Sequence, residues 1–214
     1  PSMPPSSLKI EDRLRGLDFN TGEILGKSNQ GEVRRFRLDE RDLAIKTPKG
    51  RRLSWRLGQA TLRREHRAYQ RLTGLTGFAP CHGLFDDRYL ALDYIDGAPF
   101  RDADIDIRER FFEQLLSVIE TMHAAGVAHG DLKRKDNLRV DSEQRPVILD
   151  LGAAVLRRNG FHPLNRRLFD FIRQTDLNAW IKLKYGGYDN VSDNDLNRLR
   201  RSGLERLLSR LRRR

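Results

Sequence analysis

The chain has 214 residues, of which 33% are charged and 38% hydrophobic, and its formal net charge is +11. This length can bury the core of one or two domains, and the single cysteine, Cys81, excludes an internal disulfide and favours a reducing compartment. No apolar run approaches the roughly 18 residues that a membrane helix needs, and the Pro- and Ser-rich N-terminus lacks the pattern of a signal peptide. We therefore expect a cytoplasmic protein without a transmembrane segment.

The first half of the chain predicts a sheet with one helix beside it. Residues 19–47 alternate apolar and polar side chains between glycine turns, which is typical of antiparallel strands. In chain order, we expect a disordered N-terminus at 1–7, a short helix at 8–16, the sheet at 19–47, a helix at 53–73 with Leu62, Tyr69 and Leu72 inward, and two strands at 83–95 around an Asp86-Asp87 turn.

The second half predicts helices with one small hairpin. Residues 107–125 are strongly amphipathic, and their apolar positions are Phe111, Phe112, Leu115, Leu116, Ile119 and Met122. We expect a hairpin at 138–149 and two further helices at 164–184 and 192–211.

Two acids and an amide follow the 107–125 helix at a spacing that suits phosphoryl transfer. Asp131 lies in the His-Gly-Asp-Leu-Lys run at 129–133, Asn137 follows, and Asp150 ends an apolar stretch that is typical of a buried strand. One carboxylate can orient a hydroxyl while the other holds Mg²⁺. Phosphoryl transfer needs this division because its catalysis is mostly positioning and charge neutralisation.

An upstream segment supplies groups that could hold phosphates. Gly26 and Gly31 lie in a loop between two strand-like runs, where they let the backbone bend close to phosphate oxygens. Lys46 ends the next strand-like run and can act as an anion clamp. Glu65, 19 residues further on a helical pattern, is its expected partner, and two unpaired surface charges are the alternative.

In this order, over residues 22–152, these motifs and the Asp-Tyr-Ile run at 93–95 resemble the protein-kinase-like superfamily. The resemblance implies an α+β, two-lobed fold with an antiparallel-sheet N-lobe at 8–95 and a reduced helical C-lobe with a basic C-terminal helix at 96–214. Only 62 residues follow Gly152, which resembles the minimal RIO-type and bacterial lipopolysaccharide-kinase groups.

The resemblance also implies roles for individual residues. Asp131 would accept or orient the substrate hydroxyl, and Lys133 would neutralise charge on the transferred phosphoryl group. Asn137 and Asp150 would hold Mg²⁺, or Mn²⁺ in its place. ATP would be held by the phosphate loop, by the strand lysine with its partner, and by the hinge between the lobes. The residues expected to bind ATP are Gly26, Ser28, Gly31, Val33, Ala44, Lys46, Glu65, Leu92, Asp93 and Ile95.

The chain departs from the family pattern at three places. Ser28 replaces a third glycine of the phosphate loop. Gly130 replaces an arginine that pairs with a phosphorylated activation loop, so we expect no such switch. Asn137 lies six residues after Asp131, where the family has five, so Asp136 remains an alternative metal ligand.

Two further residues bear on the catalytic loop, which is the segment at 129–133 that carries Asp131. We expect His129 to support the loop by hydrogen bonding and not to take part in the chemistry. Asp176 either anchors the loop backbone from below or is an ordinary exposed helical acid.

Three functions are compatible with these residues. The first is an ATP- and Mg²⁺-dependent kinase that phosphorylates Ser or Thr hydroxyls of protein. The second is a kinase that acts on a sugar hydroxyl of a glycolipid, the lipopolysaccharide core. The third is a nucleotide-binding pseudokinase regulator. This interpretation is opposed by four intact residues, which are Lys46, Glu65, Asp131 and Asp150.

The C-terminal segment at 197–214 contains eight Arg and one Glu, with leucines at helical spacing. Such a basic amphipathic helix could contact an anionic surface and hold the protein at the inner face of a membrane. Alternatively, its leucines pack on the body and its arginines are solvated. No aromatic residues interleave the arginines, which argues against nucleic acid as a partner.

Overall fold

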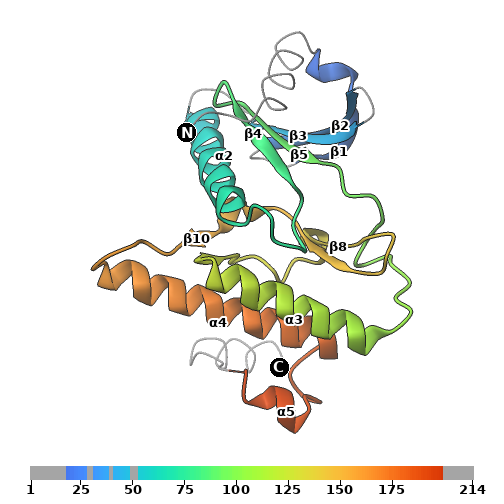
Figure 1. Ribbon diagram of the computed structural model, residues 1–214, viewed down its shortest axis with the longest axis vertical. Coiled ribbons are helices and arrows are strands. Elements are labelled where there is room, and N and C mark those ends of the chain that lie inside the picture. The colour runs from blue at the N-terminus through green and yellow to red at the C-terminus, as the bar shows by residue number, and fades with distance from the viewer. Residues whose placement is uncertain (1–17, 28–30, 39–40, 49–52, 200–214) are drawn as a thin grey trace, which may run out of the picture.

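The computed structural model describes residues 18–27, 31–38, 41–48 and 53–199. Figure 1 shows a sheet and one helix in the upper part of the molecule, and two long helices side by side in the lower part. The chain is therefore a mixed α+β protein with an antiparallel sheet, as expected. The predictions for 1–7 and 8–16 and for the basic segment beyond residue 199 fall outside the described residues.

The upper sheet has five antiparallel strands in the order β1-β2-β3-β5-β4. The turn between β4 and β5 contains Asp86 and Asp87, both with a φ of 52°, a backbone region that Asp tolerates better than most residues. The strands predicted at 19–47 and 83–95 are confirmed, although β4 begins two residues earlier. They are β1 (Glu23–Lys27), β2 (Gly31–Leu38), β3 (Arg41–Pro48), β4 (Cys81–Phe85) and β5 (Tyr89–Asp93), preceded by the 3₁₀ turn η1 (Phe19–Thr21).

Side-chain alternation along β3 gives the sheet two different faces. On the outer face, Leu43 and Ile45 are almost fully buried in an aromatic-rich cluster. On the inner face, Ala44 and Lys46 remain partly exposed, as does Val33 on the neighbouring strand β2. The inner face therefore keeps polar and apolar side chains accessible to a ligand.

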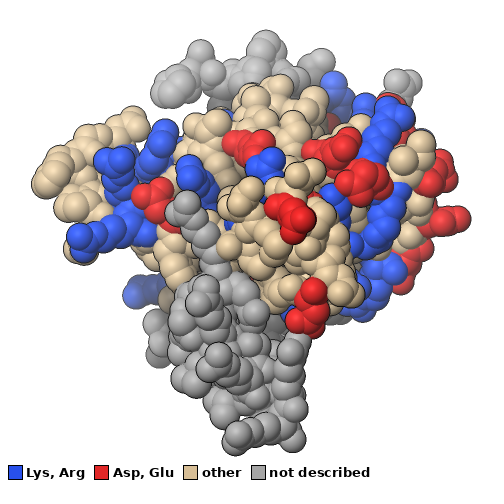
Figure 2. Space-filling view, turned by 90° about the horizontal axis from the view of Figure 1, so that it is seen from below, with Lys and Arg blue, Asp and Glu red and all other residues tan. Residues whose placement is uncertain are grey.

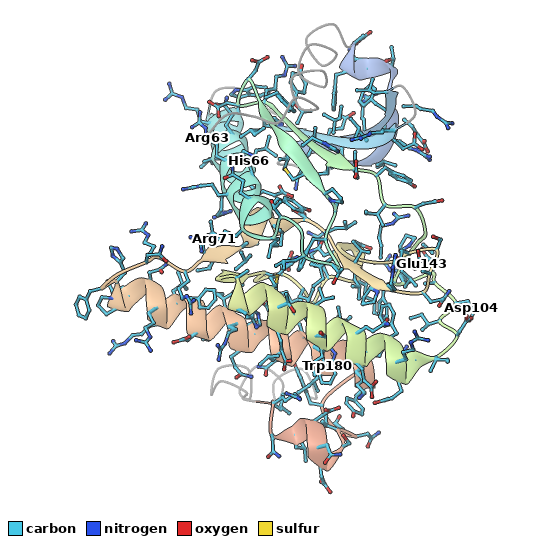
Figure 3. All side chains as sticks on the ribbon, in the orientation of Figure 1. Arg63, His66, Arg71, Asp104, Glu143 and Trp180 are labelled. Carbon is cyan, nitrogen blue, oxygen red and sulfur yellow. The ribbon has the colours of Figure 1, made fainter. Side chains whose placement is uncertain are left out.

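Helix α2 (Leu53–Arg71) confirms the helix predicted at 53–73, and its three predicted inward residues are each 2% exposed. Arg71, labelled in Figure 3, ends this helix and points to the lower part of the molecule. Its guanidinium donates to the backbone carbonyls of Gly126 at 2.9 Å and Arg157 at 2.8 Å. The end of α2 is thus fixed to the lower part.

Two packed helices, α3 (Arg108–Ala124) and α4 (Pro163–Tyr185), lie side by side in the lower part, with α5 (Asp193–Leu196) below them in Figure 1. Trp180 lies between them in Figure 3, and its indole Nε1 donates to the carbonyl of Phe112 at 2.8 Å. Of the helical residues described, none belongs to a helix long and apolar enough to cross a membrane. The elements after the upper sheet are β6 (Ala98–Pro99), α3 (Arg108–Ala124), β7 (Val127–Ala128), η2 (Lys135–Asn137), β8 (Leu138–Val140), β9 (Pro146–Ile148), η3 (Leu151–Ala153), β10 (Val155–Leu156), α4 (Pro163–Tyr185) and α5 (Asp193–Leu196).

The continuous helix predicted at 192–211 is wrong in its described part, because α5 has only four residues and the chain then turns at 197–199. In place of a longer helix, this segment has a short helix that contacts the end of α4. The Asp195 carboxylate accepts hydrogen bonds from the Tyr185 hydroxyl at 2.7 Å and from Lys184 Nζ at 3.0 Å. Local periodicity alone could not reveal these tertiary contacts.

Candidate active site

Three charged side chains from distant segments meet at the inner face of the sheet. Lys46 on β3 reaches Glu65 on α2, with 2.8 Å between Nζ and Oε2. Its Nζ also lies 2.7 Å from Oδ1 of Asp150, 104 residues further along the chain. The Glu65 side chain is 1% exposed, whereas that of Asp150 is half exposed. The predicted ion pair of Lys46 and Glu65 is therefore present, and Asp150 extends it towards solvent.

The charge on this cluster follows from burial and from mutual attraction. Burial opposes the charge of Lys46, but Glu65 and Asp150 more than offset this, so the pKa of the ammonium lies above its ordinary value. Burial also opposes ionisation of Asp150, yet Lys46 brings the pKa of this carboxyl below its ordinary value. At Glu65 burial dominates and raises the pKa. A lysine that stays charged between two acids is prearranged to meet phosphate oxygens.

Four of the residues predicted to hold ATP share one face of the sheet. Val33 pairs with Lys46 across β2 and β3, and Ala44 pairs with Leu92 across β3 and β5. Directly paired residues lie on the same face, and so do residues two apart on one strand. The structure therefore brings these four side chains together on the inner face.

The phosphate loop lies at the end of the β1–β2 hairpin. Gly26 pairs with Val33, and Gly31 opens β2. A Cβ atom at Gly31 would lie 2.7 Å from the carbonyl oxygen of Thr47, so this position has no room for a side chain. Ser28 lies outside the described residues.

The predicted hinge follows β5. The Asp93 amide donates to the carbonyl of Pro80 at 2.9 Å, and the Tyr94 amide donates to that of Asp42 at 2.8 Å. The carboxylate of Asp93 is bonded to the ring of His82, 2.6 Å away. The Asp93 side chain and the amides of Asp93 and Tyr94 are therefore all engaged within the protein. Ile95 follows and packs against the main core.

Asp176 on α4 holds the backbone of the catalytic loop. Its carboxylate is fully buried and accepts from the amides of His129 at 2.7 Å and Gly130 at 2.9 Å. His123, near the end of α3, bonds to the same carboxylate at 3.0 Å. Gly130 has a φ of 81°, which favours glycine and accounts for the missing side chain. The anchoring role predicted for Asp176 is confirmed, and the exposed alternative is wrong.

His129 is a structural support of the same loop, as expected. Its Nδ1 accepts from the Asp131 amide at 3.1 Å, and its Nε2 lies 2.9 Å from the carbonyl oxygen of Leu149. Both bonds together require a neutral ring that carries its proton on Nε2. The ring therefore joins the segment of Asp131 to the residue before Asp150.

Asn137, and not Asp136, turns into the loop. Its Nδ2 donates to the carbonyl of Asp131 at 3.0 Å, which leaves the amide oxygen for another partner. The backbone carbonyl of Asn137 accepts from the amide of Leu149 at 2.9 Å, so Asn137 lies next to the segment that ends in Asp150. Asp136 is exposed and pairs with Arg101 at 3.0 Å.

An amide oxygen and a carboxylate oxygen are hard ligands, so Asn137 and Asp150 fit a cation such as Mg²⁺. Within the described ranges, no three His, Cys, Asp or Glu side chains gather to hold a metal. A cation here would therefore need further oxygen ligands, which the phosphates of a nucleotide can supply.

The role of Arg64 could not be predicted from any pattern in the sequence. Its guanidinium, on α2, donates to the carbonyl of Gly152, two residues after Asp150. A Cβ atom at Gly152 would lie 3.0 Å from Cγ2 of Thr61, so a larger residue there would crowd α2. Lys133, in contrast, is exposed beside the loop, and no described ion pair joins it to the Lys46 cluster.

Comparison with known proteins gives weak and partial similarity to protein kinases. No family model matches the chain. Over 150 residues, or 64% of the chain, it is 27% identical to a rice (Oryza sativa subsp. japonica) protein provisionally named CBL-interacting protein kinase 27, of which it covers 37%. Over 71 residues, or 30% of the chain, it is 34% identical to CBL-interacting protein kinase 9 of the same plant, of which it covers 15%.

The chain thus spans little more than a third of the length of the first of these curated relatives and less of the second. The similarity supports a relationship to protein kinases at a coarse level. Neither relative bears on the RIO-type or lipopolysaccharide-kinase groups.

Proposed function

We propose that this chain is an ATP- and Mg²⁺-dependent phosphotransferase that transfers the γ-phosphoryl group to Ser or Thr hydroxyls of protein. The observation that carries the proposal is the contact of Lys46 with both Glu65 and Asp150. Kinases need a lysine held by a helical glutamate, together with a carboxylate for the metal. Surface charges that come together by chance would not place a buried glutamate against the lysine at the centre of such a cluster.

Each group has a part that its geometry allows. Lys46 presents its ammonium to phosphate oxygens, because two carboxylates hold it in place. Asp150 and Asn137 would hold Mg²⁺, which would neutralise charge on the phosphates when bound. Asp131 lies on a loop that Asp176 fixes, and there it can accept or orient the proton of the acceptor hydroxyl.

The names of both rice proteins support a protein acceptor, since each is called a protein kinase. A regulator without transfer activity has less support. Its site would not require the Asn137 side chain to bond to the Asp131 carbonyl while the Asn137 carbonyl bonds to Leu149, the residue before Asp150.

The test is incubation with ATP labelled at the γ-phosphate and Mg²⁺, with the chain alone, with soluble cell extract and with cell envelope. We expect label on protein, recovered as phosphoserine or phosphothreonine after acid hydrolysis. Lys46→Met should lose this labelling, because the phosphates lose their anchor.

Two results would contradict the proposal. Label found only in a glycolipid fraction would make a sugar hydroxyl the acceptor. ATP binding without transfer in any fraction would make the chain a regulator.

A further inference from the structure

A cavity of about 580 Å³ opens beside the catalytic loop, and its charged lining is almost entirely basic. It lies between the loop before α3, the loop that follows Asp131, and the end of α4. Asp104, labelled in Figure 3, is in the loop before α3, which forms one wall of the cavity. It is the single acid of the lining. The basic residues of the lining are Arg101, Arg108, Lys133, Lys135 and Lys182.

Two of the five cations are engaged within the protein. The guanidinium of Arg108 donates to the carbonyls of Leu183 and Lys184, both at 3.1 Å, and lies 4.8 Å from the centre of the Phe112 ring. Arg101 pairs with Asp136, and both side chains are more than half exposed. Arg108 therefore has a structural role, and Arg101 is only loosely held.

The other three cations, Lys133, Lys135 and Lys182, are exposed and have no ion pair with any carboxylate among the residues that the structure describes. Clustering like charges around one cavity costs free energy unless an anion relieves the repulsion. Figure 2, which views the lower face, shows that Lys and Arg side chains gather towards both ends of this face. Lys133 and Lys135 of the cavity lining belong to the segment that follows Asp131.

The position of the cavity relative to Asp131 gives its charge a use. Lys133 follows Asp131 by two residues, and two residues span at most about 7 Å. A ligand whose negative charges reach Lys133 and Lys135 is therefore bound at the loop that also carries Asp131. The free lysines come from two separate segments, so they suit several carboxylates spread along a chain better than one compact anion.

We infer that this cavity binds acidic side chains that flank the acceptor hydroxyl, so that the substrates are acidic Ser- or Thr-containing peptide segments. The inference rests on the proposed function, because it names the substrate class of that site. Cationic side chains at a binding surface select an acidic partner mainly through charge complementarity, and salt weakens this attraction.

The test compares three fluorescent peptides that carry one Ser flanked by Glu, by Gln or by Lys. Fluorescence anisotropy measures their binding, and labelled ATP measures their phosphorylation. We expect the Glu peptide to bind at least about tenfold more tightly than the Gln peptide at low salt, and high salt should reduce the difference.

Lys135→Glu combined with Lys182→Glu should raise the KM of the Glu peptide roughly tenfold or more, because two attractions become repulsions. The same double variant should gain affinity for the Lys peptide, which would also show that it is folded. The matched control is Arg166→Glu with Arg167→Glu. This pair makes the same change in net charge on exposed positions of α4 outside the cavity, and it should leave peptide affinity unchanged.

Equal binding of the three peptides to the parent chain would overturn the inference. So would an equal loss of affinity in the control pair, because the effect would then come from net charge alone. Binding of glucose 6-phosphate without binding of the Glu peptide would also overturn it, in favour of a small phosphorylated acceptor. Preferential binding of the Glu peptide without phosphate transfer would support recognition of acidic segments and contradict the proposed function instead.

Discussion

The Asp131 carboxylate has a part in the proposed chemistry that is distinct from nucleotide binding. Asp131→Asn should leave ATP affinity nearly unchanged and lower kcat by roughly 10²–10⁴-fold, the usual scale for a positioned base. Steady-state kinetics and equilibrium ATP binding measure the two quantities separately. Asp136→Asn is the matched control, because Asp136 is exposed and pairs only with Arg101 among described residues, and it should retain dependence on Mg²⁺. Parallel loss of binding and turnover in Asp131→Asn would make that residue structural.

The pH dependence of stability tests the state of Asp150. Burial raises the pKa of this carboxyl, but Lys46 lowers it by more, so it lies below the ordinary value. Such a group stabilises the fold above its unfolded pKa of about 3.9, and this contribution is lost as pH falls through the folded pKa. Because the Asp150 side chain is half exposed, we expect its ion pair to contribute about 0–1 kcal/mol to the free energy of unfolding, as an ordinary surface ion pair does.

Asp150→Asn should therefore lower the free energy of unfolding at pH 7. The difference in this free energy between variant and parent should shrink below about pH 4. Urea denaturation at pH 7, 5 and 3 measures this. A difference that stays constant or grows towards low pH would contradict the assigned ionisation.

Which contacts could be predicted depended on sequence distance and local pattern. The pair of Lys46 and Glu65 was predictable because each residue lies on a recognisable strand or helix within a known order of motifs. The bond of His123 to Asp176 was not, because the residues are 53 apart and neither lies in a short motif. The position of Lys133 in a basic cavity was also not predictable. The sequence around Lys133 does not show which basic residues from other segments will lie near it in the fold.

At the scale of elements, α4 is the support for the catalytic loop. Asp176→Asn should destabilise the fold by about 2–4 kcal/mol, because an amide nitrogen replaces one acceptor oxygen opposite buried donors. Denaturation measures this loss, and kcat should fall with it as the loop loosens. Asp170→Asn, on an exposed position of the same helix, should change neither. If Asp176→Asn were as stable as the parent, the loop would be held by other contacts.

Long, periodic elements were predictable, and short ones were not. Helices α2 and α3 have their buried residues where apolar spacing indicated, because many side chains repeat one pattern over several turns. Strands β6, β7 and β10 have two residues each, too few to show a period. Helix α5 has only four residues, and the contacts of Asp195 with the end of α4 are ones that no local pattern reveals.

At the scale of the whole molecule, the site exists because α2 is held to both parts. Lys46 and Glu65 connect it to the sheet, and Arg71 connects it to Gly126, just after α3, and to Arg157, just after β10. The order of motifs, through its resemblance to kinases, predicted that the strand lysine and Asp150 would share one site. Composition and periodicity alone could not have done so, since neither gives the path of the chain between two elements.

The most direct test of this account is Mg²⁺-dependent transfer of label from γ-labelled ATP by the parent chain and by Asp150→Asn. We expect the parent to transfer label only when Mg²⁺ or Mn²⁺ is present. Asp150→Asn should lose transfer and the tightening of ATP binding by Mg²⁺, because the carboxylate ligand is gone. Turnover of Asp150→Asn equal to that of the parent, or parent transfer unaffected by a chelator, would contradict the account.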